Sequence, residues 1–185
     1  AILDAGLKRM PESSILLWIK AGKLERAGDI DGAIAIYDQM YAKDSGNQII
    51  ANNLASLITT HRTDAADLER AYAIARRLRG SQVPAFQDTY GWIEFRRGNL
   101  EDSLTYLEPA ARGLPNDALA QFHLGMAYAA LGRTDQAKAT LEAALTLAGD
   151  SPLAQFAMAR ETRVTLGTAA PGTPVLAPGL TSGGN

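Results

Sequence analysis

Apolar and polar positions follow a helical period along most of the chain. A small residue and a larger apolar residue recur four positions apart on one face, as in Ser103 with Leu107 and Ala137 with Leu141. No segment alternates strictly between apolar and polar residues over the length of a strand. The pattern therefore predicts an all-α protein.

The chain also repeats itself with a fixed spacing. GNLEDSLTYLEPAARGLPND begins at Gly98, and a similar segment, GRTDQAKATLEAALTLAGDS, begins 34 residues later at Gly132. Another helical segment precedes each of them as the first helix of the hairpin, and it contains Gly91 in one copy and Gly125 in the other. The spacing predicts hairpins of two antiparallel helices, because such pairs bury their apolar faces by stacking on one another.

The repeat frame divides the chain into units over residues 14–47, 48–83, 84–117 and 118–151. The unit 48–83 is 36 residues long, and we assign the difference to a few extra residues in the connection HRTDAAD and a slightly shortened exit before Pro84. Residues 1–10 are interpreted as the end of a truncated repeat and 152–166 as a capping helix, which completes a solenoid over 1–166. Residues 167–185 are rich in Gly and Pro without periodicity, so we expect a flexible tail.

These repeats resemble the tetratricopeptide-repeat (TPR) family over residues 14–151. Leu124-Gly125 and Tyr128 match places in the family signature. The resemblance implies a right-handed superhelical solenoid whose concave surface binds a partner protein or peptide. A looser likeness is to the C-terminal part of large bacterial TPR proteins of exopolysaccharide and envelope systems.

In that family the first helix of each hairpin lines the concave groove at fixed places of the repeat. Carried over place by place, the resemblance implies an apolar groove with aromatic anchors. The residues at these places are Ile15, Trp18, Arg26, Asn52, Ser56, Asp88, Trp92, Phe95, Arg96, Leu119, Phe122 and Met126, together with the neighbouring Asn53.

Asn53 is the single match to the carboxylate clamp with which one TPR subclass captures C-terminal peptides. Trp18, Gly22, Ala85 and Thr89 occupy the other clamp places. An asparagine ladder is also missing, because Ile19, Thr89 and His123 fill the places equivalent to Asn53. Neither known peptide-capture pattern is therefore expected here.

Charge and residue types exclude several other functions. The net charge is -2 with no basic stretch, which argues against nucleic acid as a partner. No apolar run is long enough to insert into a membrane, and there is no cysteine. His61 and His123 lie in different units without the spacing of a metal site, and no carboxylate pair is typical of acid–base catalysis. We therefore expect no metal, no cofactor and no enzyme in this chain.

The first functional hypothesis is a protein-interaction scaffold. The alternative is a regulatory or substrate-presenting domain of a larger multidomain enzyme, and a third possibility is self-association through the N-terminal edge, which a truncated repeat would leave apolar. The chain begins without a methionine, so we expect that residues precede Ala1. The compartment stays open between the bacterial envelope or periplasm and the cytoplasm.

Overall fold

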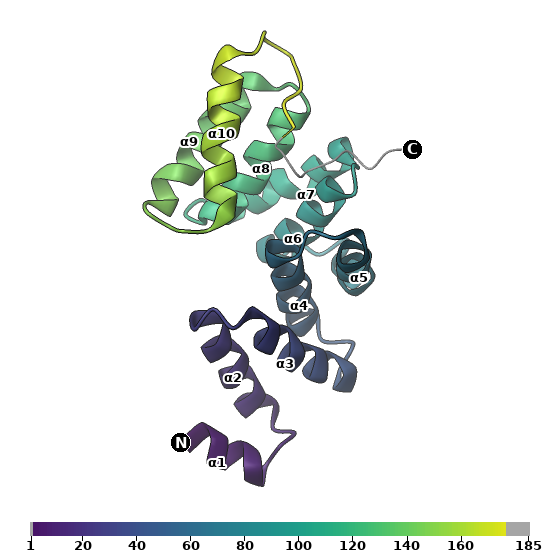
Figure 1. Ribbon diagram of the computed structural model, residues 1–185. Helices are drawn as coiled ribbons and strands as arrows, with labels where there is room; N and C mark the ends of the chain where they lie inside the picture. The colour runs from purple at the N-terminus through teal and green to yellow at the C-terminus, as the bar shows by residue number, and fades with distance from the viewer. Residues whose placement is uncertain (1, 177–185) are drawn as a thin grey trace. The chain divides into compact units, whose positions relative to one another are not determined.

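The computed structural model describes residues 2–176, and every regular element in that range is a helix (Figure 1), which confirms the predicted all-α class. The elements are α1 Ile2–Arg9, α2 Ser14–Arg26, α3 Ile30–Lys43, α4 Gln48–His61, α5 Ala65–Ala75, the 3₁₀ turn η1 Arg76–Leu78, α6 Pro84–Arg96, α7 Leu100–Gly113, α8 Ala118–Ala130, α9 Thr134–Ala148 and α10 Ala154–Thr168.

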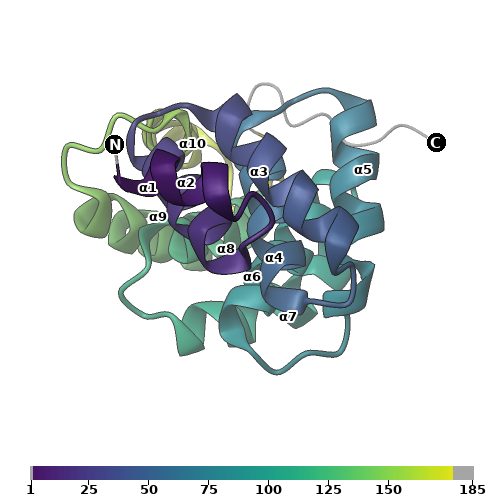
Figure 2. The ribbon, with the colours of Figure 1, turned by 90° about the horizontal axis from the view of Figure 1, so that it is seen from below.

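The chain forms two compact units, residues 1–77 and 78–185. In unit 1, α2 packs on α3, α3 on α4 and α4 on α5, while α1 contacts α2. In unit 2, α6 packs on α7, α7 on α8 and α8 on α9, and α10 lies against both α8 and α9 (Figure 1, Figure 2). Each unit is thus a stack of helical hairpins, as the repeat frame predicts.

Glycines allow the two helices of a hairpin to approach closely in unit 2. A Cβ atom added to Gly125 of α8 would lie 2.7 Å from Leu141 Cδ2 of α9, and one added to Gly91 of α6 would lie 2.9 Å from Leu107 Cγ of α7. Both distances are too short for a side chain. These glycines therefore set the hairpin spacing at equivalent places of two repeats.

The unit 48–83 accommodates its extra residues differently from our expectation. Helix α4 has 14 residues, whereas α2, α6 and α8 each have 13. The turn from α4 to α5 covers only residues 62–64, which matches the turns 27–29, 97–99 and 131–133 of the other hairpins. The second extra residue lies in the exit, because five residues, 79–83, separate η1 from α6, whereas four residues separate α3 from α4 and α7 from α8. The longer α4 keeps the backbone groups of the other extra residue hydrogen-bonded, which a longer turn after that helix would not.

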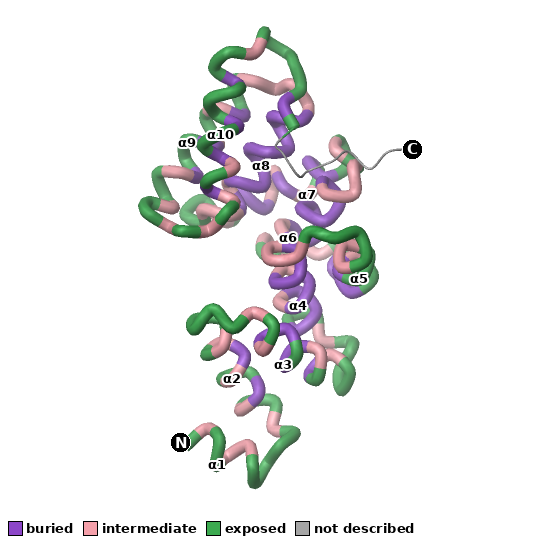
Figure 3. The backbone as a smooth tube through the Cα atoms, viewed as in Figure 1, coloured by how far each residue is buried: buried purple, intermediate pink, exposed green. Residues whose placement is uncertain are grey.

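Burial is uneven along the chain (Figure 3). Helix α1 has no buried residue, whereas most of α8 is buried. In unit 2 a continuous apolar cluster extends from α6 to α10, with Phe122, Leu141 and Leu166 fully enclosed. Helix α10 covers this end of the cluster, at the place where the sequence predicts a capping helix.

The segment after α10 departs from the expected flexible tail over residues 167–176. Helix α10 continues to Thr168, and the chain then turns back onto α8, where the Val175 amide donates a hydrogen bond of 2.8 Å to the Ala129 carbonyl oxygen. Composition did not reveal this contact, because one buried valine suffices to anchor a segment otherwise rich in Gly and Pro. The predicted tail's remaining residues, 177–185, lie outside the described range.

Candidate peptide-binding groove

Unit 1 contains an apolar hollow of about 640 Å³ between α2, the end of α3 and the start of α4. Its sides include four exposed large apolar side chains: Ile15 at 74%, Trp18 at 40%, Ile19 at 49% and Ile49 at 54%. Such side chains usually occur singly on a protein surface, so their convergence makes this hollow the candidate binding surface.

Helical spacing places these side chains together. Ile15, Trp18 and Ile19 are three and four residues apart on α2, so they share one face of that helix. Ile49 is in the first turn of α4, which begins at the N-cap Asn47, whose Oδ1 accepts hydrogen bonds from the amides of Ile49 and Ile50 at 3.1 and 3.3 Å. The cap therefore fixes the wall of the hollow opposite α2.

The floor of the hollow consists of buried side chains. Met40 of α3 and Ile50 of α4 line it and are both buried. The Trp18 ring meets the ring of Tyr37 edge to face, with centroids 5.9 Å apart and an interplanar angle of 83°. Trp18 is thus held from behind while its outer face is open to a partner.

Polar groups are few at the mouth of the hollow. Lys43 Nζ donates to the backbone oxygen of Glu12 at 3.1 Å and to its carboxylate at 3.2 Å. Ser14, Asp44 and Asn47 complete the lining. An apolar interior with a small number of polar groups at the edge suits apolar side chains of a partner segment.

A hydrogen-bond network lies beside Trp18 and contains two predicted groove residues. The Tyr37 hydroxyl donates to Glu25 Oε1 at 2.8 Å and accepts from Asn53 Nδ2 at 3.3 Å, while Asn52 Nδ2 donates to Asn53 Oδ1 at 3.3 Å. Burial, together with the neighbouring Glu25 carboxylate, raises the pKa of Tyr37 to about 12. Asn53 therefore supports the tyrosine that backs Trp18.

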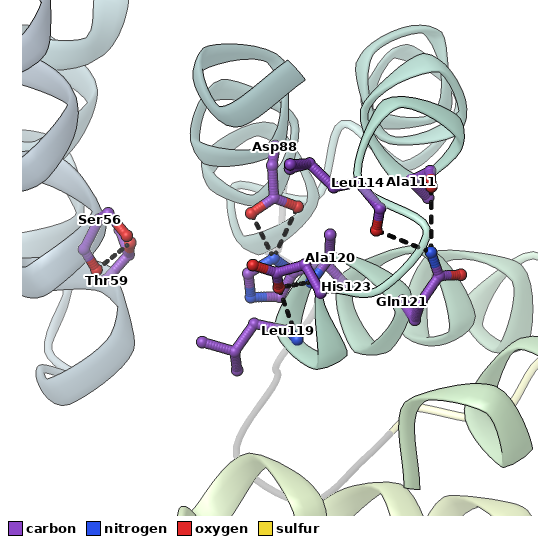
Figure 4. Close-up of polar contacts among 10 residues, drawn as sticks. Ser56, Thr59, Asp88, Ala111, Leu114, Leu119, Ala120, Gln121 and His123 are labelled. Carbon is purple, nitrogen blue, oxygen red and sulfur yellow. Dashed lines mark hydrogen bonds and ion pairs between the residues drawn. The ribbon is translucent and has the colours of Figure 1, made fainter. Parts of the chain in front are cut away.

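Two further predicted residues in α4 lie outside the hollow. Asn52 is buried and Ser56 is half-buried, and neither contributes to the lining. The Ser56 backbone oxygen accepts a hydrogen bond of 3.1 Å from Thr59 Oγ1 (Figure 4). Of the predicted groove residues in unit 1, Ile15 and Trp18 line the hollow. Ile19 and Ile49 also line it, although the family places did not select them.

The predicted aromatic anchors of unit 2 require a correction. Trp92, Phe95, Phe122 and Met126 are exposed by 4%, 3%, 0% and 1%, and all four belong to the buried cluster. The Trp92 ring stacks on Phe95, with ring centroids 4.9 Å apart. The Phe122 ring meets that of Phe156 of α10 edge to face, with ring centroids 6.3 Å apart. Neighbouring first helices and α10 cover these rings, so they form the core of unit 2 and are not anchors on an open groove.

Asp88 and His123 join adjacent first helices of unit 2. His123 Nδ1 lies 2.9 and 3.0 Å from the two carboxylate oxygens of Asp88 (Figure 4). The His123 ring also stacks on Trp92, with centroids 4.2 Å apart and an interplanar angle of 18°. This pair explains why Trp92 is covered. We did not anticipate it from the sequence, although a spacing of about one repeat could have indicated it.

The last two predicted residues of unit 2 are half-buried. Leu119 packs on the edge of the buried cluster, and its amide donates to Asp117 Oδ1 at 2.9 Å, which caps α8. Arg96, near the end of α6, is also half-buried. Neither is brought together with an exposed aromatic side chain of its own unit.

Within residues 2–176, no group of three or more His, Asp or Glu side chains is arranged to hold a metal ion. No helix among the same residues is long and apolar enough to cross a membrane.

Comparison with known proteins identifies the repeats. Residues 91–152 match the family model described as tetratricopeptide repeat. A TPR repeat-containing protein of Pseudomonas aeruginosa is 28% identical over 123 residues, which cover 66% of this chain. The chain spans only 20% of the length of that relative.

Solved structures show the same fold at low sequence identity. A thermophilic TPR protein of Thermus thermophilus is similar with a TM-score of 0.60 and 17% identity, covering 90% of this chain and 86% of that one. YrrB, described as a TPR protein with an unusual peptide-binding site, has a TM-score of 0.57 and 17% identity, covering 90% and 92%. MamA has a TM-score of 0.53 and 19% identity, covering 85% and 88%.

Proposed function

We propose that this chain, whose residues 91–152 match the tetratricopeptide-repeat family, is a protein-interaction scaffold whose unit 1 groove binds an apolar segment of a partner protein. The observation that carries the proposal is the convergence of Ile15, Trp18, Ile19 and Ile49 around one hollow. The described peptide-binding site of YrrB, a structural neighbour, supports a role of this class.

The chemistry of the groove specifies the segment that it accepts. Its walls are aliphatic and aromatic, its floor is Met40 and Ile50, and its charged groups lie at the edge. A partner segment that inserts one or two large apolar side chains would remove Trp18 and its neighbours from water, which is the main source of binding free energy in such sites.

A peptide library displayed on phage tests the proposal. Selection on the intact chain should enrich peptides with closely spaced large apolar residues, and Trp18→Ala should weaken their binding about thirtyfold, as expected of a central aromatic anchor. Leu147→Ala is the matched control, because Leu147 is 41% exposed on α9 of unit 2 and outside the groove. Equal binding by the wild type and Trp18→Ala would refute the groove assignment.

A further inference from the structure

The chain after α10 binds to unit 2 as a short non-helical peptide would. Residues 170–174 are exposed, Val175 is only 7% exposed, and Leu176 is again 45% exposed. Val175 belongs to the same buried cluster as Phe122 and Leu141. One side chain of an irregular segment is therefore inserted into the core of unit 2.

Two backbone amides of this segment donate hydrogen bonds to the end of α8 and the start of α9. The Val175 amide donates to the Ala129 oxygen at 2.8 Å, and the Gly172 amide donates to Thr134 Oγ1 at 3.4 Å. The last carbonyl groups of a helix have no partner further along that helix, so they are available to a segment that binds there. The Ala129 oxygen also accepts the Gly132 amide at 3.1 Å, within the turn to α9.

The receiving surface has the small residues that a close backbone approach requires. Ala127, Ala129 and Ala130 form the end of α8. A Cβ atom added to Gly132 would lie 2.3 Å from the Gly172 oxygen, so a side chain there would collide with the segment. The φ angle of Gly132 is +70°, which also disfavours other residues. The turn from α8 to α9 thus leaves space for a second segment of backbone to lie against it.

We propose that the end of α8 is a peptide-binding site for a non-helical segment in which proline precedes a β-branched aliphatic residue, and that residues 169–176 occupy it within the same chain. Pro171 and Pro174 restrict the free segment, which lowers the entropy lost on binding. The site lies wholly in unit 2 and does not depend on the groove of unit 1.

In this arrangement the tethered segment and a free peptide compete for the same site. A segment tethered by a short linker has an effective concentration on the order of millimolar, so a free peptide of the same sequence must displace it. The tethered segment is anchored by a single buried side chain. A charge at position 175 should therefore release it and leave the site open to the free peptide.

The test uses a synthetic peptide of residues 169–176 with blocked ends, titrated into the isotope-labelled full chain and followed through the backbone amide signals of residues 129–134. We expect the peptide to bind Val175→Asp at least about tenfold more tightly than it binds the wild type. Burial of a valine side chain changes the equilibrium constant for docking of the tethered segment by a factor of about ten or more. A peptide that itself carries aspartate at position 175 should not bind.

Matched variants separate this result from unfolding and from the groove of unit 1. Leu176→Asp should behave as the wild type, because Leu176 is largely exposed. If Val175→Asp loses helicity, Val175→Ala replaces it, because that change removes most of the buried side chain of the tethered segment and leaves the receiving surface of α8 and α9 unaltered. Trp18→Ala combined with the releasing variant should bind the peptide unchanged. Unshifted signals at millimolar peptide in the folded releasing variant, equal binding by the wild type, or loss of binding with Trp18→Ala would each overturn the proposal.

Discussion

Unit 1 and unit 2 share a repeat but use their aromatic residues differently. Trp18 in unit 1 keeps 40% of its surface exposed beside an open hollow, whereas Trp92 in unit 2 is 4% exposed and stacks with both Phe95 and His123. Tyr37 meets the Trp18 ring edge to face. The difference shows that a ring on a first helix stays accessible to a partner only where the neighbouring helices leave it uncovered.

Equivalent repeat places illustrate the same point. The fifth place of the four repeats is occupied by Trp18, Asn52, Asp88 and Phe122. Of these, Trp18 is exposed, Asp88 is half-buried, and Asn52 and Phe122 are buried. What covers each differs, because Phe156 of α10 contacts Phe122 and His123 pairs with Asp88. The repeat place fixes the direction in which a side chain projects, and the residues of the next helix determine its exposure.

The largest expected effect concerns the two tryptophans. Trp92→Ala should lower the free energy of unfolding of unit 2 by about 3–5 kcal/mol, as for other buried aromatic residues. Trp18→Ala should cost clearly less, because much of that ring is already in contact with water. Urea titration followed by circular dichroism measures both. Equal losses would mean that Trp18 is as well packed as Trp92, and the contrast between the units would fail.

A smaller and opposite pair of effects is expected at two helix glycines. Gly125→Ala should destabilise the chain by about 1–3 kcal/mol, because the new Cβ atom meets Leu141 at 2.7 Å. Gly22→Ala in α2 should stabilise it by about 0.5–1 kcal/mol, since the nearest atom is the flexible end of Arg26 at 3.5 Å and alanine favours the helix. Thermal melting of both variants checks the signs. A stabilising Gly125→Ala would show that the hairpin of α8 and α9 can separate without cost.

The sequence predicts the fold well because the repeat is a local property. The helical period, the glycines at the hairpin contacts and the 34-residue spacing are each visible within one or two units, and the helices follow them. Which side chains stay exposed depends instead on contacts between one repeat and the next. Whether Trp92 is covered depends on His123, which lies in the next repeat of the same unit. Whether residues 169–176 bind to unit 2 depends on Val175 and on the end of α8. Such contacts cannot be obtained from the places of a single repeat.

The smallest expected effect is a pH dependence that arises behind the groove of unit 1. The pKa of Tyr37 is raised from 10.0 to about 12 by burial and by Glu25. Below pH of about 10 both the folded and the unfolded chain carry a protonated Tyr37, so its contribution to stability is constant. Above that pH the unfolded chain loses its proton first, and the free energy of unfolding falls as the pH rises towards the folded pKa.

At pH of about 10.5 this loss should be at most about 1 kcal/mol relative to neutral pH, and Tyr37→Phe should abolish it. Urea titrations of the wild type and the variant between neutral pH and about 10.5 measure the difference in slope. Tyr128→Phe is the matched variant in unit 2, because the pKa of Tyr128 is also raised by burial and by the nearby Glu108. Since Tyr37 has the large shift, Tyr37→Phe should flatten the pH dependence more than Tyr128→Phe does. The reverse order would place the stronger desolvation in unit 2 and contradict the enclosed Tyr37 on which the support of Trp18 depends.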